Sequence, residues 1–165
     1  MGKEFTAAEI VKIATDLKGY GNKAFTEMKN LALGLEKYQK GLRYLNEEPE
    51  ETDETKGPLL ALRYSLNSNS ALLANKLKDY TEGLRSASAA LDVSGIQDTE
   101  KAKALFRRAV AHIGLKDEDS ALADLEEANK LVPGDAAVVQ ELNKVKKAAA
   151  ERAKKEKAAY SKFFS

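Results

Sequence analysis

Residues 99–134 decide the fold of this chain, and they read TEKAKALFRRAVAHIGLKDEDSALADLEEANKLVPG. The stretch holds two amphipathic segments separated by a short charged turn, and it ends at a Pro-Gly pair that breaks a helix. Small residues stand where two antiparallel helices would approach most closely: Ala109, Ala121 and Ala128. The pattern therefore predicts a helix–turn–helix unit.

The same spacing of small residues recurs earlier in the chain. The middle copy has Ala71, Gly83 and Ala90. The first copy, whose turn is one residue longer, has Gly21, Gly34 and Gly41. Each copy also offers one residue to fill the layer between its helices, namely Tyr38, Ala87 and Leu125. Repetition of this kind predicts an all-α stack in which each unit buries its apolar face against the next.

The composition agrees with one all-α domain and excludes several classes of function. The 165 residues carry 27 Lys and Arg against 26 Asp and Glu, so the net charge of +1 gives no nucleic-acid signature. Cysteine is absent from the sequence, which excludes disulfide and thiolate chemistry and favours a cytoplasmic location. No apolar run approaches the roughly 20 residues that a membrane span needs.

Local signals set the expected boundaries. Thr6-Ala-Ala-Glu9 has the form of a capping box, and Pro58 suits the first turn of a helix. We expect a non-native leader at 1–5, an acidic loop at 46–57, and a capping and projecting basic helix at 134–165. The three repeats are expected at about 6–45, 58–92 and 99–133, with second helices at about 31–45, 80–91 and 118–131.

Polar residues inside the helical sequence predict a binding site. Lys18 and Asn22 are four residues apart and share one helix face, and Lys103 and Arg107 repeat that geometry. Asn69 also lies inside a helix, although Asn is a mediocre helix former. If the first helices of the repeats stand side by side, these donors converge and suit the two carboxylates of a C-terminal Asp. Secondary contacts to a peptide are expected from Phe25, Leu72 and Lys76.

These motifs resemble a known family. The repeats resemble the tetratricopeptide repeat, a unit of roughly 34 residues whose copies stack into a right-handed superhelix. Leu17–Phe25, Leu66–Ser70 and Lys103–Arg107 look like the dicarboxylate clamp of tetratricopeptide co-chaperones. The resemblance implies capture of the Glu-Glu-Val-Asp C-terminus of heat shock protein 90, with heat shock protein 70 as a further candidate. It assigns the clamp to Lys18, Asn22, Asn69, Lys103 and Arg107.

A narrower resemblance is to the large cyclophilins of the forty-kilodalton class. The insertion between the first two repeats and the ending from Glu156 to Phe164 carry it. It implies that this chain is the C-terminal half of a peptidyl-prolyl isomerase and is not itself an enzyme. Gly34 and Gly83 depart from the family pattern, which usually has Ala there, and this implies looser packing of the second helices.

Other interpretations remain open. The basic end, Lys144 to Phe164, could be a membrane-surface helix, or the chain could be a structural scaffold that binds calmodulin through it. An enzyme is less well supported, since His112 is the only histidine and is expected to be structural. The acidic run Glu47–Glu54 is expected to be a solvated loop rather than a metal site. We therefore expect no catalytic residue, cofactor, metal, nucleic acid or membrane span.

Overall fold

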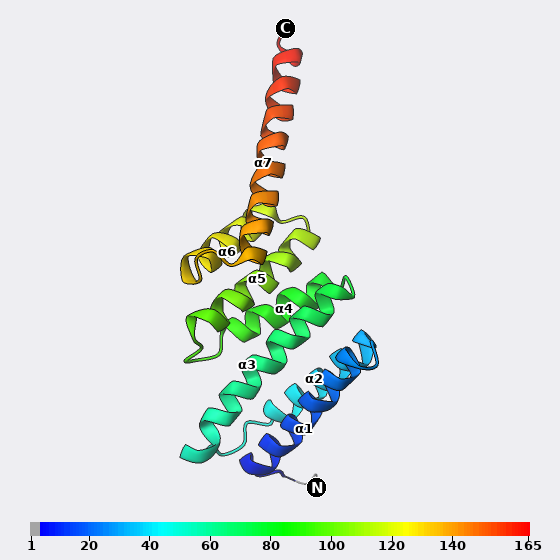
Figure 1. The fold of residues 1–165 in the computed structure, drawn as a ribbon, viewed down its shortest axis with the longest axis vertical. Helices are drawn as coiled ribbons and strands as arrows, with labels where there is room; N and C mark the ends of the chain where they lie inside the picture. The colour runs from blue at the N-terminus through cyan, green and yellow to red at the C-terminus, as the bar shows by residue number, and fades with distance from the viewer. Residues whose placement is uncertain (1–3) are drawn as a thin grey trace.

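The computed structural model describes residues 4–165, which form seven α-helices and no strand (Figure 1). Three antiparallel helix pairs follow one another along the long axis, and a long last helix extends from the end of the stack. The all-α prediction, with three helical pairs and a terminal helix, is confirmed. The helices are α1 (Ala7–Thr26), α2 (Leu31–Leu45), α3 (Asp53–Lys76), α4 (Tyr80–Leu91), α5 (Asp98–Gly114), α6 (Glu118–Leu131) and α7 (Ala136–Phe163).

Helix starts follow from local capping. The predicted capping box is present, because the Glu9 amide donates to Thr6 Oγ1 at 3.2 Å and the Thr6 amide donates to Glu9 Oε2 at 2.9 Å. The turn within each helix pair repeats a two-residue pattern, a lysine with positive φ followed by an Asn or Asp that caps the second helix. These lysines are Lys29, Lys78 and Lys116. The same local cap therefore starts the second helix of each pair, although the first turn is one residue longer than the other two.

The start of α3 differs from the sequence prediction. The helix begins at Asp53 rather than Pro58, so the acidic loop is shorter and spans 46–52. Thr52 caps the helix by accepting from the Thr55 amide, and the carboxylates of Asp53 and Glu54 in the first turn favour the positive end of the helix dipole. Pro58 is therefore accommodated inside the helix.

The expected leader at 1–5 lies partly outside the described residues. The described part begins at residue 4, and Phe5 packs on the N-terminal core. Its ring meets the ring of Tyr44 edge-on, with the centroids 5.6 Å apart. Phe5 therefore belongs to the packed domain.

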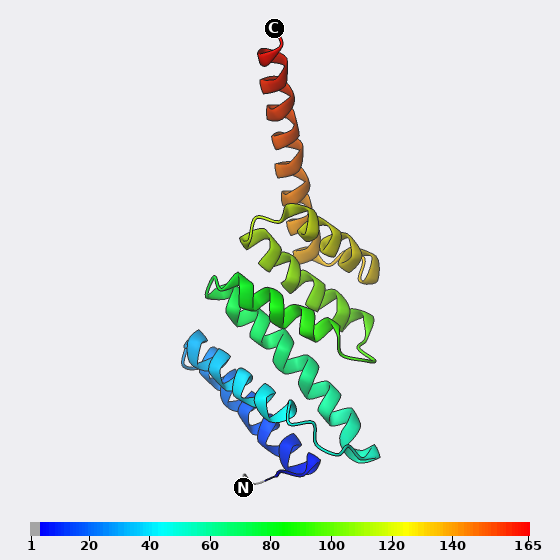
Figure 2. The ribbon, with the colours of Figure 1, turned by 180° about the vertical axis from the view of Figure 1, so that it is seen from behind.

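The stack has an inner and an outer layer. Helices α1, α3 and α5 contact one another in succession, while α2 and α4 pack behind them and bridge to the next repeat (Figure 2). One core cluster lies among the first three helices and a second lies among α5, α6 and α7. The inner layer therefore brings side chains from all three repeats onto one side.

Glycines allow the first repeat to pack closely. A Cβ at Gly21 would collide with the ring of Tyr38, and one at Gly34 would lie 2.8 Å from Leu73 Cδ1. Gly83 faces the amide of Asn75 in the same way. At Gly34 and Gly83 a neighbouring side chain occupies the space that a Cβ would need, so both second helices pack closely at these positions.

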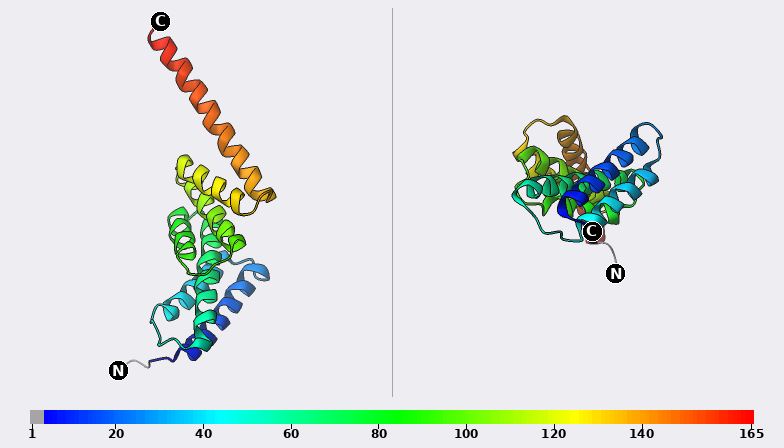
Figure 3. Two further views of the ribbon diagram at one scale, coloured as in Figure 1. Left: turned by 90° about the vertical axis from the view of Figure 1, so that its left-hand side faces the viewer. Right: turned by 90° about the horizontal axis from the view of Figure 1, so that it is seen from below.

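Helix α7 has two unlike halves. Val138, Leu142 and Val145 are buried against α5 and α6, whereas nearly all residues from Lys146 onward are exposed. Figure 3 shows this second half extending away from the repeats. No helix in the described part of the chain is long and apolar enough to cross a membrane.

Candidate functional site

Arg107 is the central group of the inner layer. Its side chain in α5 is 9% exposed, and Nη1 donates to Ser68 Oγ on α3 at 2.5 Å. Burial lowers the pKa of the guanidinium, while Tyr64 and Tyr38 act in the opposite direction. Within residues 4–165 no carboxylate forms an ion pair with Arg107. A buried cation without a counter-ion is costly, so its charge is available to an external anion.

Four other arginines have acidic partners, as charged side chains in proteins usually do. Each of them pairs with an acidic side chain within 3.4 Å, and they are Arg63, Arg85, Arg108 and Arg152. Arg108, next to Arg107 in the chain, makes two bonds to Asp124, at 2.8 and 2.7 Å. Arg43 also lacks an acidic partner but is exposed, so within residues 4–165 Arg107 is the arginine that is both buried and unpaired.

Tyr38 is hydrogen-bonded to Asn22 and lies within the electrostatic influence of Arg107. The phenol of Tyr38, 2% exposed on α2, donates to Asn22 Oδ1 at 2.7 Å. Burial raises the pKa of Tyr38 and the nearby Arg107 charge lowers it, with burial the larger effect, so the hydroxyl remains a donor at neutral pH. Because the Asn22 carbonyl oxygen accepts this bond, its NH2 group is left for a ligand.

Helix α3 contributes Ser68 and Asn69 to the polar residues of the inner layer. Ser68 accepts from Arg107, and the next residue, Asn69, is half-buried and makes no recorded side-chain hydrogen bond in the described chain. Two further bonds hold α5 against α3. Asn75 Nδ2 donates to the Arg107 carbonyl at 2.8 Å, and Tyr64 OH donates to the Glu100 carbonyl at 2.9 Å.

Three lysines of the inner helices have no ion-pair partner among residues 4–165. Lys18 is half-buried one helical turn before Asn22, and Lys103 is exposed one turn before Arg107. Lys76 is exposed in the last turn of α3, about 10 Å along the helix from Asn69. A hydrogen bond thus joins Asn22 to Tyr38, and the charge of Arg107 acts on the same phenol, while Lys76 lies apart from them.

Phe25 and Leu72 have mainly a packing role. Both are half-buried and pack against the N-terminal core cluster. Only part of each side chain is exposed, so either could offer a peptide a limited apolar contact.

The sequence did not reveal Tyr38 and Ser68 as parts of the site. Tyr38 was predicted as a residue of the layer between the helices, and its burial agrees with that prediction. The missed signal was its hydroxyl, because a buried Tyr must find a hydrogen-bond partner, whereas Ala87 and Leu125 at the equivalent positions need none.

A mostly apolar pocket of about 330 Å³ adjoins Lys103 where α5 meets the start of α7. Phe106 and Val138 contribute apolar walls, and Lys103 and Asp135 supply charge at its edge. The complete lining is Thr99, Ala102, Lys103, Phe106, Val132, Asp135, Ala137 and Val138.

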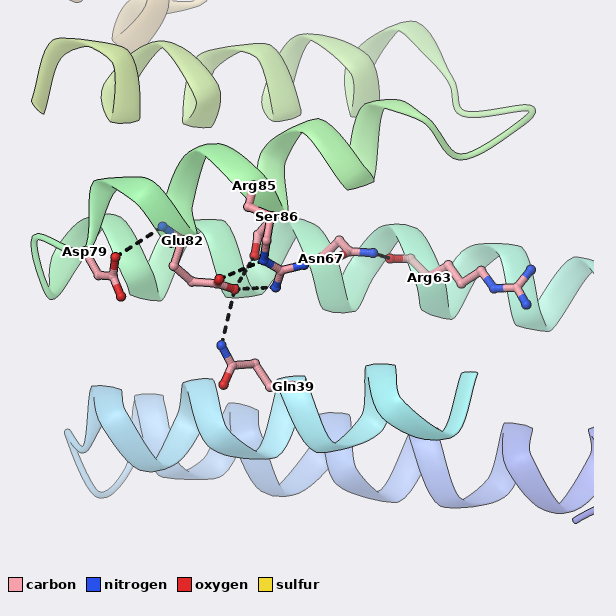
Figure 4. Close-up of polar contacts among 7 residues, drawn as sticks. All are labelled: Gln39, Arg63, Asn67, Asp79, Glu82, Arg85 and Ser86. Carbon is pink, nitrogen blue, oxygen red and sulfur yellow. Dashed lines mark hydrogen bonds and ion pairs between the residues drawn. The ribbon is translucent and has the colours of Figure 1, made fainter. Parts of the chain in front are cut away.

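A second, more polar pocket of about 320 Å³ lies near the contact of α2 with the second repeat. Figure 4 shows the polar contacts at this place, among them those of Gln39, Glu82 and Arg85. Gln39 Nε2 donates to Glu82 Oε1 at 3.2 Å across this contact. Arg85 and Ser86 also donate to the Glu82 carboxylate, and these bonds, chiefly from Arg85, lower the pKa of Glu82. This cluster ties the first repeat to the second.

Neither histidine nor carboxylates form a second site in the described residues. His112 Nδ1 lies 3.4 Å from Asp117 Oδ2, and Nε2 lies 3.8 Å from Asp124 Oδ2. Within residues 4–165, no cluster of His, Asp and Glu has the geometry to hold a metal ion. His112 therefore joins α5 to the turn and helix that follow it.

Comparison with known proteins identifies a curated relative. The chain is 38% identical over 164 residues to "Peptidyl-prolyl cis-trans isomerase D" of Cryptococcus neoformans. The match covers 94% of this chain but only 44% of the relative, so the chain spans less than half the length of that protein. No model of a protein family matches the chain.

Solved structures show the fold. The C-terminal tetratricopeptide-containing domain of an FK506-binding protein of Plasmodium falciparum superposes with a TM-score of 0.81 at 24% identity, covering 92% of this chain and 97% of that one. The first such domain of Spaghetti (RPAP3), bound to the HSP90 peptide SRMEEVD, gives 0.67 at 24% identity, with coverage of 85% and 95%. The second domain of human RPAP3, in complex with the HSP70 peptide SGPTIEEVD, gives 0.64 at 24% identity, with coverage of 85% and 98%.

Proposed function

Because the chain has the tetratricopeptide-repeat fold, we propose that its inner layer binds the C-terminal Glu-Glu-Val-Asp peptide of heat shock protein 90. The observation that carries this proposal is Arg107, a buried cation that no carboxylate of the described chain neutralises. A terminal Asp would supply the missing charge through its side chain and its α-carboxylate. The proposed clamp consists of Lys18, Asn22, Asn69, Lys103 and Arg107.

The donor set suits two neighbouring carboxylates. Lys18 and Lys103 provide mobile point charges, and Arg107 provides a fixed planar fork. Asn22 and Asn69 add NH2 donors without adding repulsion among the cations. We expect a dissociation constant on the order of micromolar, because a short peptide buries little area, and weaker binding at higher salt.

The solved structures support the chemistry of this ligand. The RPAP3 peptides SRMEEVD and SGPTIEEVD share the same four terminal residues. Heat shock protein 70 is therefore a second candidate partner for this chain, with the same clamp.

Calorimetric titration with a peptide ending in Glu-Glu-Val-Asp tests the proposal. Arg107→Ala should weaken binding by about 10- to 100-fold, because a charge-assisted bond is lost in a buried place. Arg152→Ala on the exposed half of α7 is the matched control and should leave affinity unchanged. Lys103→Ala should behave like Arg107→Ala, with Lys101→Ala as its control.

Changing the peptide gives an independent check. Amidation of its C-terminus removes one of the two clamped charges and should cost as much affinity as the Arg107 substitution. Equal affinity for the free and amidated peptides would refute the clamp.

We further propose that the chain is a segment of a cytoplasmic cyclophilin-type isomerase whose catalytic domain lies outside these residues. The likeness to a peptidyl-prolyl isomerase of which the chain spans 44% supports this. A prolyl-isomerase assay on this chain should show no activity above the uncatalysed rate, and clear turnover would refute it.

Helix α7 supports a second candidate function, calmodulin binding. Its distal half is exposed and basic, and it ends in the exposed aromatic residues Tyr160, Phe163 and Phe164. Titration with calcium-loaded calmodulin should saturate with the whole chain and fail with a chain ending at residue 147. Binding to calmodulin without binding to the acidic peptide would favour the scaffold role.

A further inference from the structure

The polar pocket between α2, α3 and α4 has the features of a second binding site. Its volume is about 320 Å³, and its polar walls are Gln39, Arg43, Asn46, Asn67 and Arg85. We propose that this pocket binds a Glu or Asp side chain in an extended segment of a partner protein, together with the peptide groups beside that side chain. The proposal does not depend on the carboxylate clamp.

The pocket lies on the opposite side of α3 from the proposed clamp. Asn67 lines the pocket, whereas Asn69 belongs to the proposed clamp, and residues two positions apart point about 200° apart around a helix. Figure 4 shows Gln39, Asn67 and Arg85 reaching this place from α2, α3 and α4. A ligand in this pocket would therefore use none of the groups that are proposed to hold a terminal Asp.

Arg43 gives the pocket a positive charge that the described chain does not neutralise. It is exposed on α2, and no carboxylate of residues 4–165 forms an ion pair with it. Lys40, three residues earlier on the same helix, is also exposed and has no such partner. Arg85 is bound to Glu82, through Nε at 2.8 Å and Nη2 at 2.5 Å, so these two charges cancel. The remaining charge of Arg43 suits a single carboxylate.

The amide side chains suit the peptide groups on either side of a bound carboxylate. Asn67 is 9% exposed and its Nδ2 donates to the Arg63 carbonyl at 2.9 Å, so its Oδ1 is left to accept from an N–H group. Gln39 donates through Nε2 to Glu82, which leaves its Oε1 for the same purpose. The side chain of Asn46 makes no recorded hydrogen bond in the described chain. A pocket that offers acceptors beside a cation favours a peptide over a bare anion.

The size of the pocket agrees with a ligand of one residue. Its volume of about 320 Å³ lies at the lower end of the range of about 300–1,000 Å³ that is typical of ligand sites. A bare carboxylate such as acetate would fill only a small part of this volume. An acidic residue with the peptide group on each side of it would fill much more.

An NMR titration with short blocked peptides tests the proposal. The probes are acetyl-Ala-Glu-Ala-amide and its neutral counterpart acetyl-Ala-Gln-Ala-amide, and both lack the C-terminal carboxylate on which the proposed clamp depends. The Glu peptide should shift the side-chain amide signals of Asn67 and Gln39 with a dissociation constant on the order of millimolar. The Gln peptide should bind about fivefold more weakly, because it brings no charge to Arg43. Equal binding of the two peptides would overturn the inference, whereas failure of the clamp would leave this difference intact.

Sodium acetate distinguishes a peptide site from a site for small carboxylates. At equal concentration and constant ionic strength, acetate should shift the signals of Asn67 and Gln39 much less than the Glu peptide does, because it has no N–H group for their oxygens. Equal affinity for acetate and the Glu peptide would mean that the pocket takes small anions, and the assignment to a peptide would be overturned.

Two pairs of variants locate the effect. Arg43→Ala should remove the advantage of the Glu peptide, while Arg152→Ala on the exposed half of α7 should retain it. Ala89→Glu places a carboxylate in the pocket from α4 and should also remove the advantage. Ala32→Glu makes the same change of charge at an exposed position of α2 outside the pocket and should retain it. An advantage of the Glu peptide that survives Arg43→Ala would place its carboxylate elsewhere and overturn the inference.

Discussion

At the scale of single residues, Arg107 links stability and binding in opposite directions. Its guanidinium is desolvated and donates to the hydroxyl of Ser68 rather than to a carboxylate. Replacing a buried charge by an apolar side chain of similar volume is often neutral or stabilising. The residue is thus better explained by a ligand than by the needs of the fold.

We therefore predict that Arg107→Met maintains or raises the free energy of unfolding, by up to about 2 kcal/mol, while it weakens peptide binding by about 10- to 100-fold. Urea unfolding and calorimetry on the same preparation measure the two effects. The Asn75 bond goes to the backbone carbonyl of residue 107 and would survive the change. A large loss of stability would mean that the cation is structural.

Tyr38 gives a second prediction at this scale. Tyr38→Phe removes the hydroxyl that bonds Asn22 but keeps the buried ring. We expect peptide affinity to fall about threefold to tenfold and stability to fall by only about 1 kcal/mol. In an Asn22→Ala background the same substitution should no longer affect affinity, whereas a purely structural role would weaken binding in both backgrounds.

The limits of sequence reasoning are visible at these residues. Lys18, Asn22, Lys103 and Arg107 could be proposed because four-residue spacing fixes a helix face whatever the tertiary structure. The bonds from Tyr38 to Asn22 and from Arg107 to Ser68 join residues 16 and 39 positions apart. No local pattern encodes such pairs, so the bonds of Asn22 and Arg107, two residues of the proposed clamp, became visible only in the structure.

At the scale of helices, packing depends on which glycines are covered. Gly19 and Gly21 lie two positions apart in α1 and face different surroundings. A Cβ at Gly19 would meet no atom within 4 Å, whereas one at Gly21 would strike Tyr38. The same residue type thus has opposite roles on the two faces of one helix.

We predict opposite effects for two matched substitutions. Gly19→Ala should stabilise the protein by up to about 1 kcal/mol, because Ala is the better helix former. Gly21→Ala should destabilise it by about 1–3 kcal/mol through overpacking and should also weaken peptide binding, since Tyr38 must move. Thermal unfolding of both variants measures the contrast, and equal shifts would contradict the packing described here.

The hydrogen bonds of Glu82, which connect α2 to α4, predict that the stability of the protein depends on pH. The pKa of Glu82 is lowered in the folded state, so its carboxylate stabilises the fold above about pH 4.5, and this contribution is lost as pH falls through the folded pKa. Glu82→Gln should therefore be less stable by about 1 kcal/mol at pH 7, and the gap should close in acid. Urea unfolding between pH 7 and pH 3 tests this. Glu36→Gln, an exposed control paired only with Lys37, should show no gap at any pH.

Helix boundaries show which local signals prevail. The helices Leu31–Leu45, Tyr80–Leu91 and Glu118–Leu131 begin and end where the sequence placed them. Their caps are contacts between residues close in sequence, so the ends of these helices can be predicted from the sequence alone. At α3 two signals competed, and the capping pair Thr52 and Thr55 started the helix before Pro58.

At the scale of the whole molecule, the chain is a linear stack with a stabilising end. Each repeat contacts its neighbours, and the first half of α7 covers the last repeat. The remaining half of α7 makes only surface ion pairs, such as Arg152 with Glu118. Stability should therefore reside almost entirely in residues 4–146.

Two truncations test this division. Removal of residues 148–165 should shift the midpoint of thermal unfolding by no more than about 2 °C, since a surface ion pair contributes less than about 1 kcal/mol. Removal from residue 135 onward uncovers Ala102 and Leu105 and loses three buried apolar side chains, so we expect a cost of roughly 5 kcal/mol. Similar midpoints for the two truncated chains would contradict the capping role of α7.

The division of the proposed clamp among α1, α3 and α5 has a consequence for local opening. In a linear array the outermost unit can fray while the rest stays folded, and each such opening of α1 removes Lys18 and Asn22 from the receptor. A bound peptide would stabilise all three units together, because its carboxylates bind only when α1, α3 and α5 are all folded and packed. Amide protons of α1 should then exchange with deuterium more slowly when the ligand is present, even those on the side of the helix that the peptide never touches.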